Sequence, residues 1–148
     1  AKEMYDAVMT FFPKTDIAVL SAAVADFRPE TAAEQKIKKN PETDILTLKL
    51  VKTDDILKSV GNKKTENQVV VGFALETENG LENAKKKLHT KNIDLIVLNE
   101  MNESGVGFKT KTNKVSIITK DDKVTEFELK PKNEVALDVL EAIYQYIN

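Results

Sequence analysis

Three continuous apolar runs, separated by segments with helical spacing, form the main pattern of the sequence. The runs lie at residues 16–22, 69–74 and 93–98. Each run predicts a buried strand, because a strand that is covered on both faces shows little hydrophobic alternation. Helical spacing of apolar residues predicts helices over 1–12 and about 81–91. Strands that alternate with helices indicate an α/β fold with a twisted, mostly parallel sheet and helices on its faces.

The remaining segments are more polar. Residues 45–51 alternate in part and predict a further strand, whereas about 23–43 and 101–112 predict loops. Residues 114–119 and 123–129 predict an appended β-hairpin around Asp121-Asp122. No internal repeat is present, and the length of 148 residues fits a single domain over 1–148.

Two further helices have predicted boundaries or faces. A short helix is predicted to begin at Thr53-Asp54-Asp55, with Thr53 or Asp54 as its cap, and to end at Gly61. A last helix is predicted to begin near Pro131. Its buried face is predicted to carry Ala136, Val139, Leu140, Ile143 and Ile147.

The composition argues against several classes of function. The formal net charge is −2 with acids and bases interspersed, which argues against a general nucleic-acid or membrane-surface binder. No apolar run is long enough to span a bilayer. The absence of cysteine excludes disulfides and thiol chemistry and suits a reducing cytoplasm. His89 is the only histidine, so a polyhistidine metal site is excluded, and we interpret it as a surface residue.

The first apolar run opens into small residues, an acid and a basic group. Ser21-Ala22-Ala23 leads to Asp26, and Lys36-Ile37-Lys38-Lys39 follows ten positions later. Small residues at the carboxyl end of a strand let a ligand approach the backbone, and ligands of open α/β sheets bind at those ends. The pattern suits a ligand with a polar head and phosphates. An ordinary surface loop with solvated charges is the alternative.

Other candidate residues follow the later strands. Phe73 could form an aromatic wall for a flat base, or could simply pack in the core. Lys87 and Lys91 are four residues apart and share a helical face, where they could hold a triphosphate or remain solvated. Asp54 and Asp55 suit the start of a helix, or could bind a ribose or a magnesium ion. Neither G-x-G-x-x-G nor a P-loop is present.

Five motifs in order resemble the bacterial phosphopantothenoylcysteine synthetase (phosphopantothenate–cysteine ligase) family. They are SAAVADFRP at 21–29, KIKK at 36–39, TDDIL at 53–57, VGFALET at 71–77 and the spaced pattern AxxKLxxKNxDxIVxN at 84–99. Each motif alone is weak, but their order and spacing match across nearly the whole chain. This family is the C-terminal ligase domain of the bifunctional coenzyme A biosynthesis flavoprotein, whose other half is a flavin-dependent decarboxylase.

The resemblance implies a Rossmann-like, dimeric, cytoplasmic enzyme. The family joins 4'-phosphopantothenate to L-cysteine, and CTP with Mg²⁺ activates the carboxylate as an acyl-cytidylate. Flavin is not expected on this segment, since it belongs to the decarboxylase half. The resemblance also implies that an N-terminal part of the ligase domain is missing, so that 1–148 would be its C-terminal two-thirds. The alternative is a catalytically incomplete nucleotide-binding or dimerisation fragment.

The resemblance also assigns roles to residues. Lys36 would be the catalytic lysine, which offsets charge as pyrophosphate leaves. Ser21 to Ala23 would face the nucleotide, and Lys87 and Lys91 would lie near its phosphates. The expected nucleotide-binding residues are Ser21, Ala22, Ala23, Asp26, Lys36, Asp54, Asp55, Ile56, Leu57, Phe73, Lys87 and Lys91. The metal ligands are left open.

Overall fold

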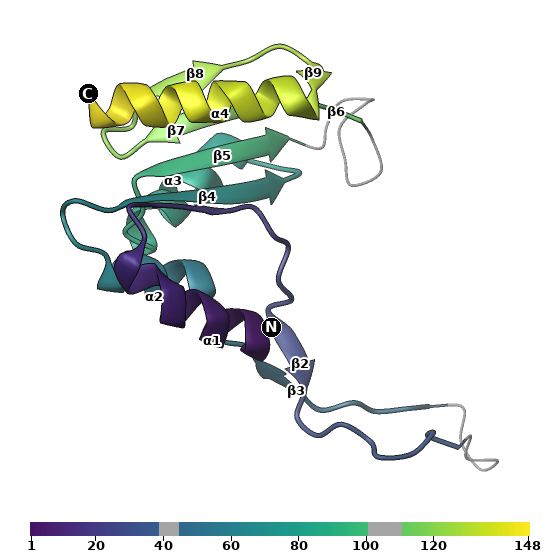
Figure 1. Cartoon of the computed structure of the whole chain (residues 1–148). Helices are drawn as coiled ribbons and strands as arrows, with labels where there is room; N and C mark the ends of the chain where they lie inside the picture. The colour runs from purple at the N-terminus through teal and green to yellow at the C-terminus, as the bar shows by residue number, and fades with distance from the viewer. Residues whose placement is uncertain (39–44, 101–110) are drawn as a thin grey trace.

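The computed structural model of the protein describes residues 1–38, 45–100 and 111–148 (Figure 1). The helices are α1 Lys2–Phe11, the 3₁₀ turn η1 Phe12–Lys14, α2 Ile56–Lys63, α3 Gly80–Thr90 and α4 Lys132–Ile147. The strands are β1 Ile17–Leu20, β2 Phe27–Pro29, β3 Leu50–Lys52, β4 Val69–Glu76, β5 Leu95–Glu100, β6 Thr112–Asn113, β7 Val115–Thr119, β8 Val124–Glu126 and β9 Lys130–Pro131. No helix of the described residues is both long and apolar enough to cross a membrane.

A central sheet carries the three predicted buried strands. Its strand order is β1-β4-β5-β7-β8. Strands β1, β4 and β5 are parallel, with Val19 opposite Val71 and Phe73 opposite Val97. Strand β7 pairs antiparallel with β5, and β8 pairs antiparallel with β7. The parallel strands therefore end at one edge of the sheet, and the predicted hairpin extends the sheet on its far side.

Helices cover the sheet on both faces, which gives three layers (Figure 1). Side chains of α1, α2 and α3 form one core with Ala18, Val70 and Ile96. Helix α4 forms a second core on the opposite face with Val71 and Val97. Because alternate residues of one strand enter different cores, β4 and β5 are buried on both sides, as their continuous apolar runs require. The predicted Rossmann-like α/β class is confirmed.

The prediction for the buried face of α4 is only partly right. Val139 and Ile143 are buried as predicted, but Leu140 and Ile147 are 60% and 53% exposed, and Ala136 is exposed as well. Val135 is buried in their place. The sheet contacts a narrower stripe of the helix than its apolar residues cover, and the sequence does not say which side of that stripe meets the sheet.

Several predicted boundaries are wrong, and each for a local reason. Helix α2 continues through Gly61 to Lys63 instead of ending at the glycine. A Cβ atom at Gly61 would overlap the carbonyl oxygen of Lys91, so this glycine serves close helix packing. The cap of α2 is Asp55 rather than Thr53 or Asp54, since its carboxylate accepts a hydrogen bond from the Lys58 N–H at 3.0 Å.

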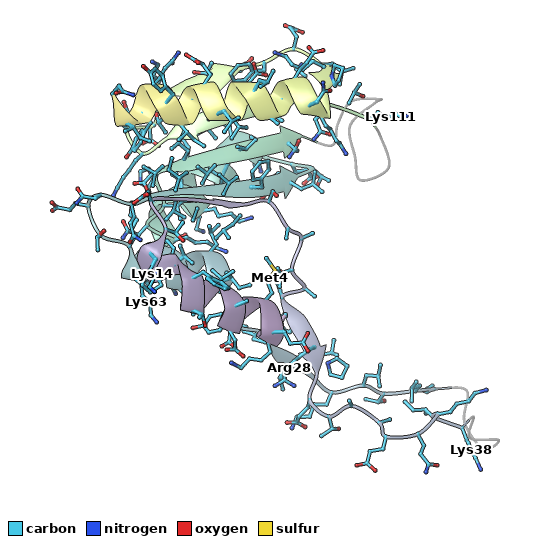
Figure 2. All side chains as sticks on the ribbon, viewed as in Figure 1. Met4, Lys14, Arg28, Lys38, Lys63 and Lys111 are labelled. Atoms are coloured by element: carbon cyan, nitrogen blue, oxygen red, sulfur yellow. The ribbon has the colours of Figure 1, made fainter. Side chains whose placement is uncertain are left out.

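A two-stranded arm leaves the body of the molecule after β1. The strand predicted for 45–51 is reduced to β3, which pairs antiparallel with β2, a strand within the predicted loop 23–43. The arm points away from the central sheet, and Lys38 lies far along it (Figure 2). Two-stranded ribbons have too few cross-strand contacts to bury their apolar side chains, and Phe27 and Leu50 are more than half exposed. Residues 39–44 of the predicted loop, and 101–110 of the later one, lie outside the described residues.

The amino end of β5 is fixed by a buried acid. Asp94 is 4% exposed and pairs with Lys64 at the end of α2. Its Oδ2 accepts the Val70 N–H at 2.9 Å, and the Tyr146 hydroxyl donates at 3.3 Å to Oδ1, the oxygen that pairs with Lys64. One carboxylate thus connects α2, β4, β5 and α4 at the edge of the sheet opposite the carboxyl strand ends.

Candidate functional site

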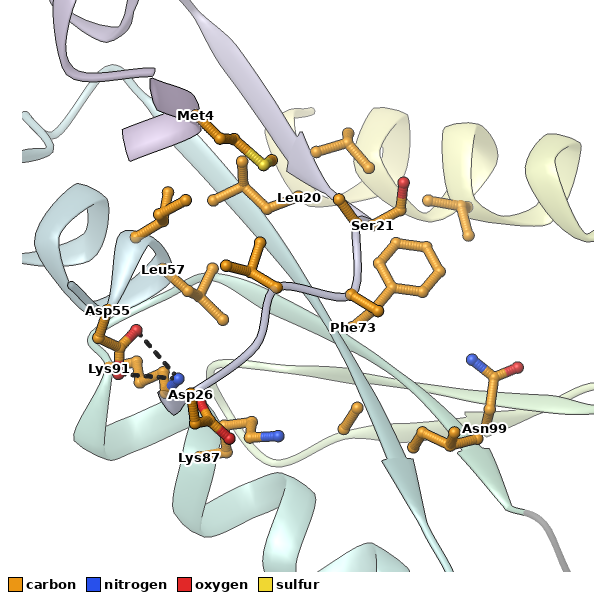
Figure 3. Close-up of a pocket in the computed structure, with 18 of the residues that line it drawn as sticks. Met4, Leu20, Ser21, Asp26, Asp55, Leu57, Phe73, Lys87, Lys91 and Asn99 are labelled. Atoms are coloured by element: carbon orange, nitrogen blue, oxygen red, sulfur yellow. Dashed lines mark hydrogen bonds and ion pairs between the residues drawn. The ribbon is translucent and has the colours of Figure 1, made fainter. Parts of the chain in front are cut away.

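A cleft of about 920 Å³ lies at the carboxyl ends of the parallel strands (Figure 3). Residues from β1, β4 and β5, from the turn before α2 and from α3 and α4 line it. This is the edge at which open α/β sheets bind ligands, because the chain diverges there to either face of the sheet.

The segment after β1 forms one wall of the cleft. Residues 21–25 leave the sheet in an extended path and carry small, mostly exposed side chains. Thr53 holds this segment in place, since its hydroxyl donates to the Ala25 carbonyl at 2.6 Å and its N–H donates to the Asp26 carbonyl at 2.9 Å. The segment after β1 and the start of α2 therefore form one continuous wall, although Asp26 and Thr53 lie 27 positions apart in the sequence.

Asp55 and Lys91 form an ion pair at the charged side of the cleft. The Lys91 ammonium lies 3.0 Å from Asp55 Oδ2 and 3.1 Å from Oδ1. Partial burial favours a raised pKa for Asp55, but the hydrogen bond from Lys58 N–H and the Lys91 charge outweigh it, so the pKa lies below its ordinary value of 3.8. Asp55 therefore stays ionised and holds the lysine at the start of α2.

Lys87 lies one helical turn before Lys91 and faces the same cleft (Figure 3). Its ammonium lies 3.8 Å from a Glu76 oxygen, a distance too long for a hydrogen bond. The other Glu76 oxygen accepts from the Asn83 side chain at 3.3 Å. Lys87 is only about one-third exposed, so its cation is directed along the cleft rather than into bulk water.

The side of the cleft nearest α4 is mostly apolar. Phe73 points to this face of the sheet and packs against the core under α4. Val19, Ala136 and Leu140 line the same side. Asn99, at the end of β5, adds a carboxamide there (Figure 3). Lys87 and Lys91 thus form a charged side of the cleft, whereas the side nearest α4 combines apolar side chains with Asn99, Asn113 and Lys132.

The structure brings nearly all of the predicted nucleotide-binding residues together. The residues that line the cleft are Ser21, Ala22, Ala23, Asp26, Asp54, Asp55, Ile56, Leu57, Phe73, Lys87 and Lys91. Lys36 does not line it: this lysine is exposed on the arm beyond β2. Lys39 of the same basic group lies outside the described residues. His89 is a surface residue, as predicted, and lies 3.0 Å from Asp122.

Sequence reasoning missed three polar residues of the cleft region. Thr53 has a clamping role, where the sequence predicted a helix cap. Glu76 and Asn99 have no predicted role beyond their places in the motifs at 71–77 and 84–99. The signal for Glu76 and Asn99 was available, because both lie at the carboxyl ends of strands that end at the same sheet edge.

The described residues contain no cluster of three or more acidic or histidine side chains that could hold a metal ion. Asp55 is already engaged by Lys91 and by Lys58 N–H. The described residues therefore do not fit a magnesium site made by protein ligands alone.

The fold defines an α/β protein with a cleft at the carboxyl edge of its parallel strands. The sequence pattern of the DNA/pantothenate metabolism flavoprotein C-terminal domain matches residues 1–147, so the chain belongs to that family.

Characterised relatives are longer than this chain. It is 43% identical over 143 residues to the coenzyme A biosynthesis bifunctional protein CoaBC of Bacillus subtilis, covering 97% of this chain and 34% of that protein. It is 43% identical over 148 residues to a cysteine/cysteine sulfinic acid decarboxylase of an unknown prokaryotic organism, covering 100% of this chain and 41% of that protein. The chain therefore spans about a third to two-fifths of these relatives.

A solved structure has the same fold. The crystal structure of the C-terminal domain of a coenzyme A biosynthesis bifunctional protein CoaBC superposes with a TM-score of 0.75 at 36% sequence identity. The match covers 98% of this chain and 63% of that one.

Proposed function

We propose that this chain is the nucleotide-using part of a ligase that joins 4'-phosphopantothenate to L-cysteine in coenzyme A biosynthesis. The observation that carries the proposal is the convergence of Asp26, Asp55, Phe73, Lys87 and Lys91 on one cleft. These residues lie in four of the five motifs that resemble the ligase family, and they come from four separate segments of the chain. Membership of the DNA/pantothenate metabolism flavoprotein family supports the same assignment.

CTP is the proposed nucleotide. Its triphosphate would lie against Lys87 and Lys91, whose mobile ammonium groups suit phosphate charge. The ribose would lie near Asp26, between the segment after β1 and the start of α2. The base would lie toward Phe73, on the apolar side of the cleft. Mg²⁺ would arrive on the triphosphate, since the described residues build no metal site of their own.

The proposed reaction has two steps. A carboxylate oxygen of 4'-phosphopantothenate attacks the α-phosphorus of CTP, the bond to the β-phosphate bridging oxygen breaks, and pyrophosphate leaves. The cysteine amine then attacks the acyl carbon, CMP leaves, and the amine loses a proton as the amide forms. Fixed cations at the triphosphate stabilise the charge that develops on the leaving pyrophosphate.

Lys36 is the proposed catalytic lysine, and its position constrains how it would act. Its side chain is exposed on the arm and does not line the cleft. The arm would have to move, or a second copy of the chain would have to supply the lysine. A homodimer is the proposed assembly, and the exposed apolar residues Phe27, Leu48 and Leu50 of the arm are those that a second copy would cover. We also propose that the full-length protein carries a flavin-dependent decarboxylase domain and works in the cytoplasm.

The test is an assay on the full-length protein. With CTP, 4'-phosphopantothenate and L-cysteine, we expect one pyrophosphate and one CMP for each amide formed. Without cysteine, pyrophosphate release is expected to stop at about one equivalent per site. Calorimetric titration with CTP and ATP comes first: binding of neither nucleotide contradicts the proposal. Binding of CTP without pyrophosphate release would reduce the chain to a nucleotide-binding module.

A further inference from the structure

Thr53 lies where the wall of the cleft meets the arm. The pair of arm residues nearest the cleft is Phe27 with Lys52. Asp26 and Thr53 are the next residues toward the body of the molecule. The Thr53 N–H donates to the Asp26 carbonyl at 2.9 Å, and the Thr53 hydroxyl donates to the Ala25 carbonyl at 2.6 Å. Two hydrogen bonds from one residue therefore close the arm at the point where its strands reach the cleft.

These two hydrogen bonds hold both of the peptide groups that flank Asp26. The Ala25 carbonyl belongs to the peptide group before Asp26, and the Asp26 carbonyl belongs to the one after it. Peptide groups are planar, so the backbone at one residue has only two dihedral angles that can turn. Thr53 therefore fixes both dihedral angles of Asp26, and with them the direction in which the Asp26 side chain leaves the backbone.

The Asp26 carboxylate has no partner of its own among the residues that the structure describes. It lines the cleft, but no hydrogen bond or ion pair joins it to a described side chain (Figure 3). Asp55 on the same wall differs, because Lys91 and the Lys58 N–H hold its carboxylate. The direction of the Asp26 carboxylate thus depends on the backbone of Asp26, and that backbone depends on Thr53.

The arm gives these hydrogen bonds a mechanical role. Phe27 follows Asp26 directly and begins the arm, which points away from the central sheet (Figure 2). Without a restraint, a swing of the arm would turn the peptide group after Asp26 and displace its carboxylate. Because Thr53 holds this peptide group and the one before it, the arm can change direction beyond Phe27 while Asp26 keeps its orientation.

We propose that Thr53 is a positioning residue, which keeps the Asp26 carboxylate directed at the ribose of the nucleotide while the arm moves. The inference rests on the proposed CTP-dependent function, in which Asp26 lies near the ribose. A carboxylate accepts hydrogen bonds from hydroxyl groups only within a narrow range of distance and angle. Loss of the Thr53 hydroxyl therefore weakens CTP binding through Asp26, since the hydroxyl itself is directed at the Ala25 carbonyl.

The test measures CTP affinity in the full-length protein by calorimetric titration. Thr53→Val keeps the size and the N–H of the residue but removes its hydroxyl, and is expected to weaken CTP binding at least about fivefold. Thr53→Ser restores the hydroxyl and is expected to recover most of the affinity. Thr53→Ala is a second variant without the hydroxyl, in case the valine variant does not fold. Thr15→Val is the matched control, since the Thr15 hydroxyl donates to the Phe11 carbonyl at 3.0 Å and Thr15 does not line the cleft. Its CTP affinity is expected to stay within about twofold of the wild-type value.

A double-mutant cycle with Asp26→Ala tests whether Thr53 acts through Asp26. Asp26→Ala alone is expected to weaken CTP binding about tenfold, and the addition of Thr53→Val is expected to weaken it by no more than about twofold further. Two losses that multiply in full would overturn the positioning role. An unchanged CTP affinity in Thr53→Val and Thr53→Ala, or an equal loss in Thr15→Val, would overturn it as well. A wild type that binds no nucleotide would instead contradict the proposed function itself.

Discussion

Lys91 and Asp55 lie 36 positions apart in sequence, and their charged atoms lie 3.0 Å apart at the charged side of the cleft. The same aspartate caps α2 through the Lys58 N–H. The pair thus fixes the end of α3 against the start of α2. Gly61 permits the approach, since it lies directly against the Lys91 carbonyl. A nucleotide phosphate entering the cleft would compete with Asp55 for the Lys91 ammonium.

Lys91→Ala is expected to weaken CTP binding by about tenfold or more, because a charge-assisted phosphate contact is lost. Stability is expected to change by less than about 1 kcal/mol, since Asp55 is partly exposed and the pair is screened. Calorimetric titration and thermal melting measure the two effects. Lys86→Ala, an exposed position on the same helix, is the control and is expected to change neither. Equal CTP affinity in both variants would show that Lys91 is a purely structural partner of Asp55.

Ionised Asp55 is expected to make part of the folding stability depend on pH in the acid range. Its pKa in the folded protein lies below 3.8, so ionised Asp55 stabilises the fold above that pH, and the stabilisation is lost as pH falls through the lower folded value. Asp55→Asn keeps a good capping residue but removes the charge. The wild type is therefore expected to be more stable than the variant at pH 7, and the difference is expected to shrink below pH 3.8. Chemical denaturation at both pH values measures it. A difference that does not depend on pH would assign the effect to capping alone.

Lys36→Gln is expected to slow the overall reaction about 100-fold or more, since a cation at the reacting phosphate is a large electrostatic contribution. Melting temperature is expected to stay unchanged, because the side chain is exposed. Lys49→Gln, on the returning side of the arm, is the control for a lost arm charge. Steady-state kinetics with saturating CTP separate the two. A wild-type rate in Lys36→Gln would mean that the lysine cluster is an ordinary solvated segment.

Phe73→Ala is expected to weaken CTP binding about tenfold, because a flat base loses its aromatic wall. The variant also loses packing under α4, so a lower melting temperature is expected as well. Phe127→Ala is the control for packing, since Phe127 borders the same core but does not line the cleft. Equal CTP affinity in the two variants would assign Phe73 to the core alone.

Gly61→Ala is expected to destabilise the fold by about 3 kcal/mol or more, because the new methyl group would overlap backbone that cannot move aside. Asn62→Ala, exposed one residue later in α2, is the control and is expected to cost less than about 0.5 kcal/mol. Denaturant midpoints of the two variants are compared. A small effect at Gly61 would mean that α2 and α3 can separate without loss of stability, and that the Lys91–Asp55 contact is adjustable.

The sequence could predict the elements that have a strong period. The three apolar runs gave the three parallel strands, and four of the five motifs placed eleven candidate residues that do share one cleft. Short strands such as β2, β6 and β9 were not predicted, because two or three residues are too few to show a hydrophobic period. The strand predicted at 45–51 was too long, because the partial alternation also covers arm residues 45–49, which form no strand.

By itself the sequence determined the fold class, the sheet edge at which the cleft lies and the chemical types of the residues at that edge. These three features follow from local patterns, because the order of apolar and polar residues predicts which strands are buried on both faces and where they end. Tertiary structure alone decided which side of α4 is buried, that Gly61 serves packing, and that Lys91 meets Asp55. Such relationships join residues from different elements, and the periodicity of a sequence does not indicate which distant residues come into contact.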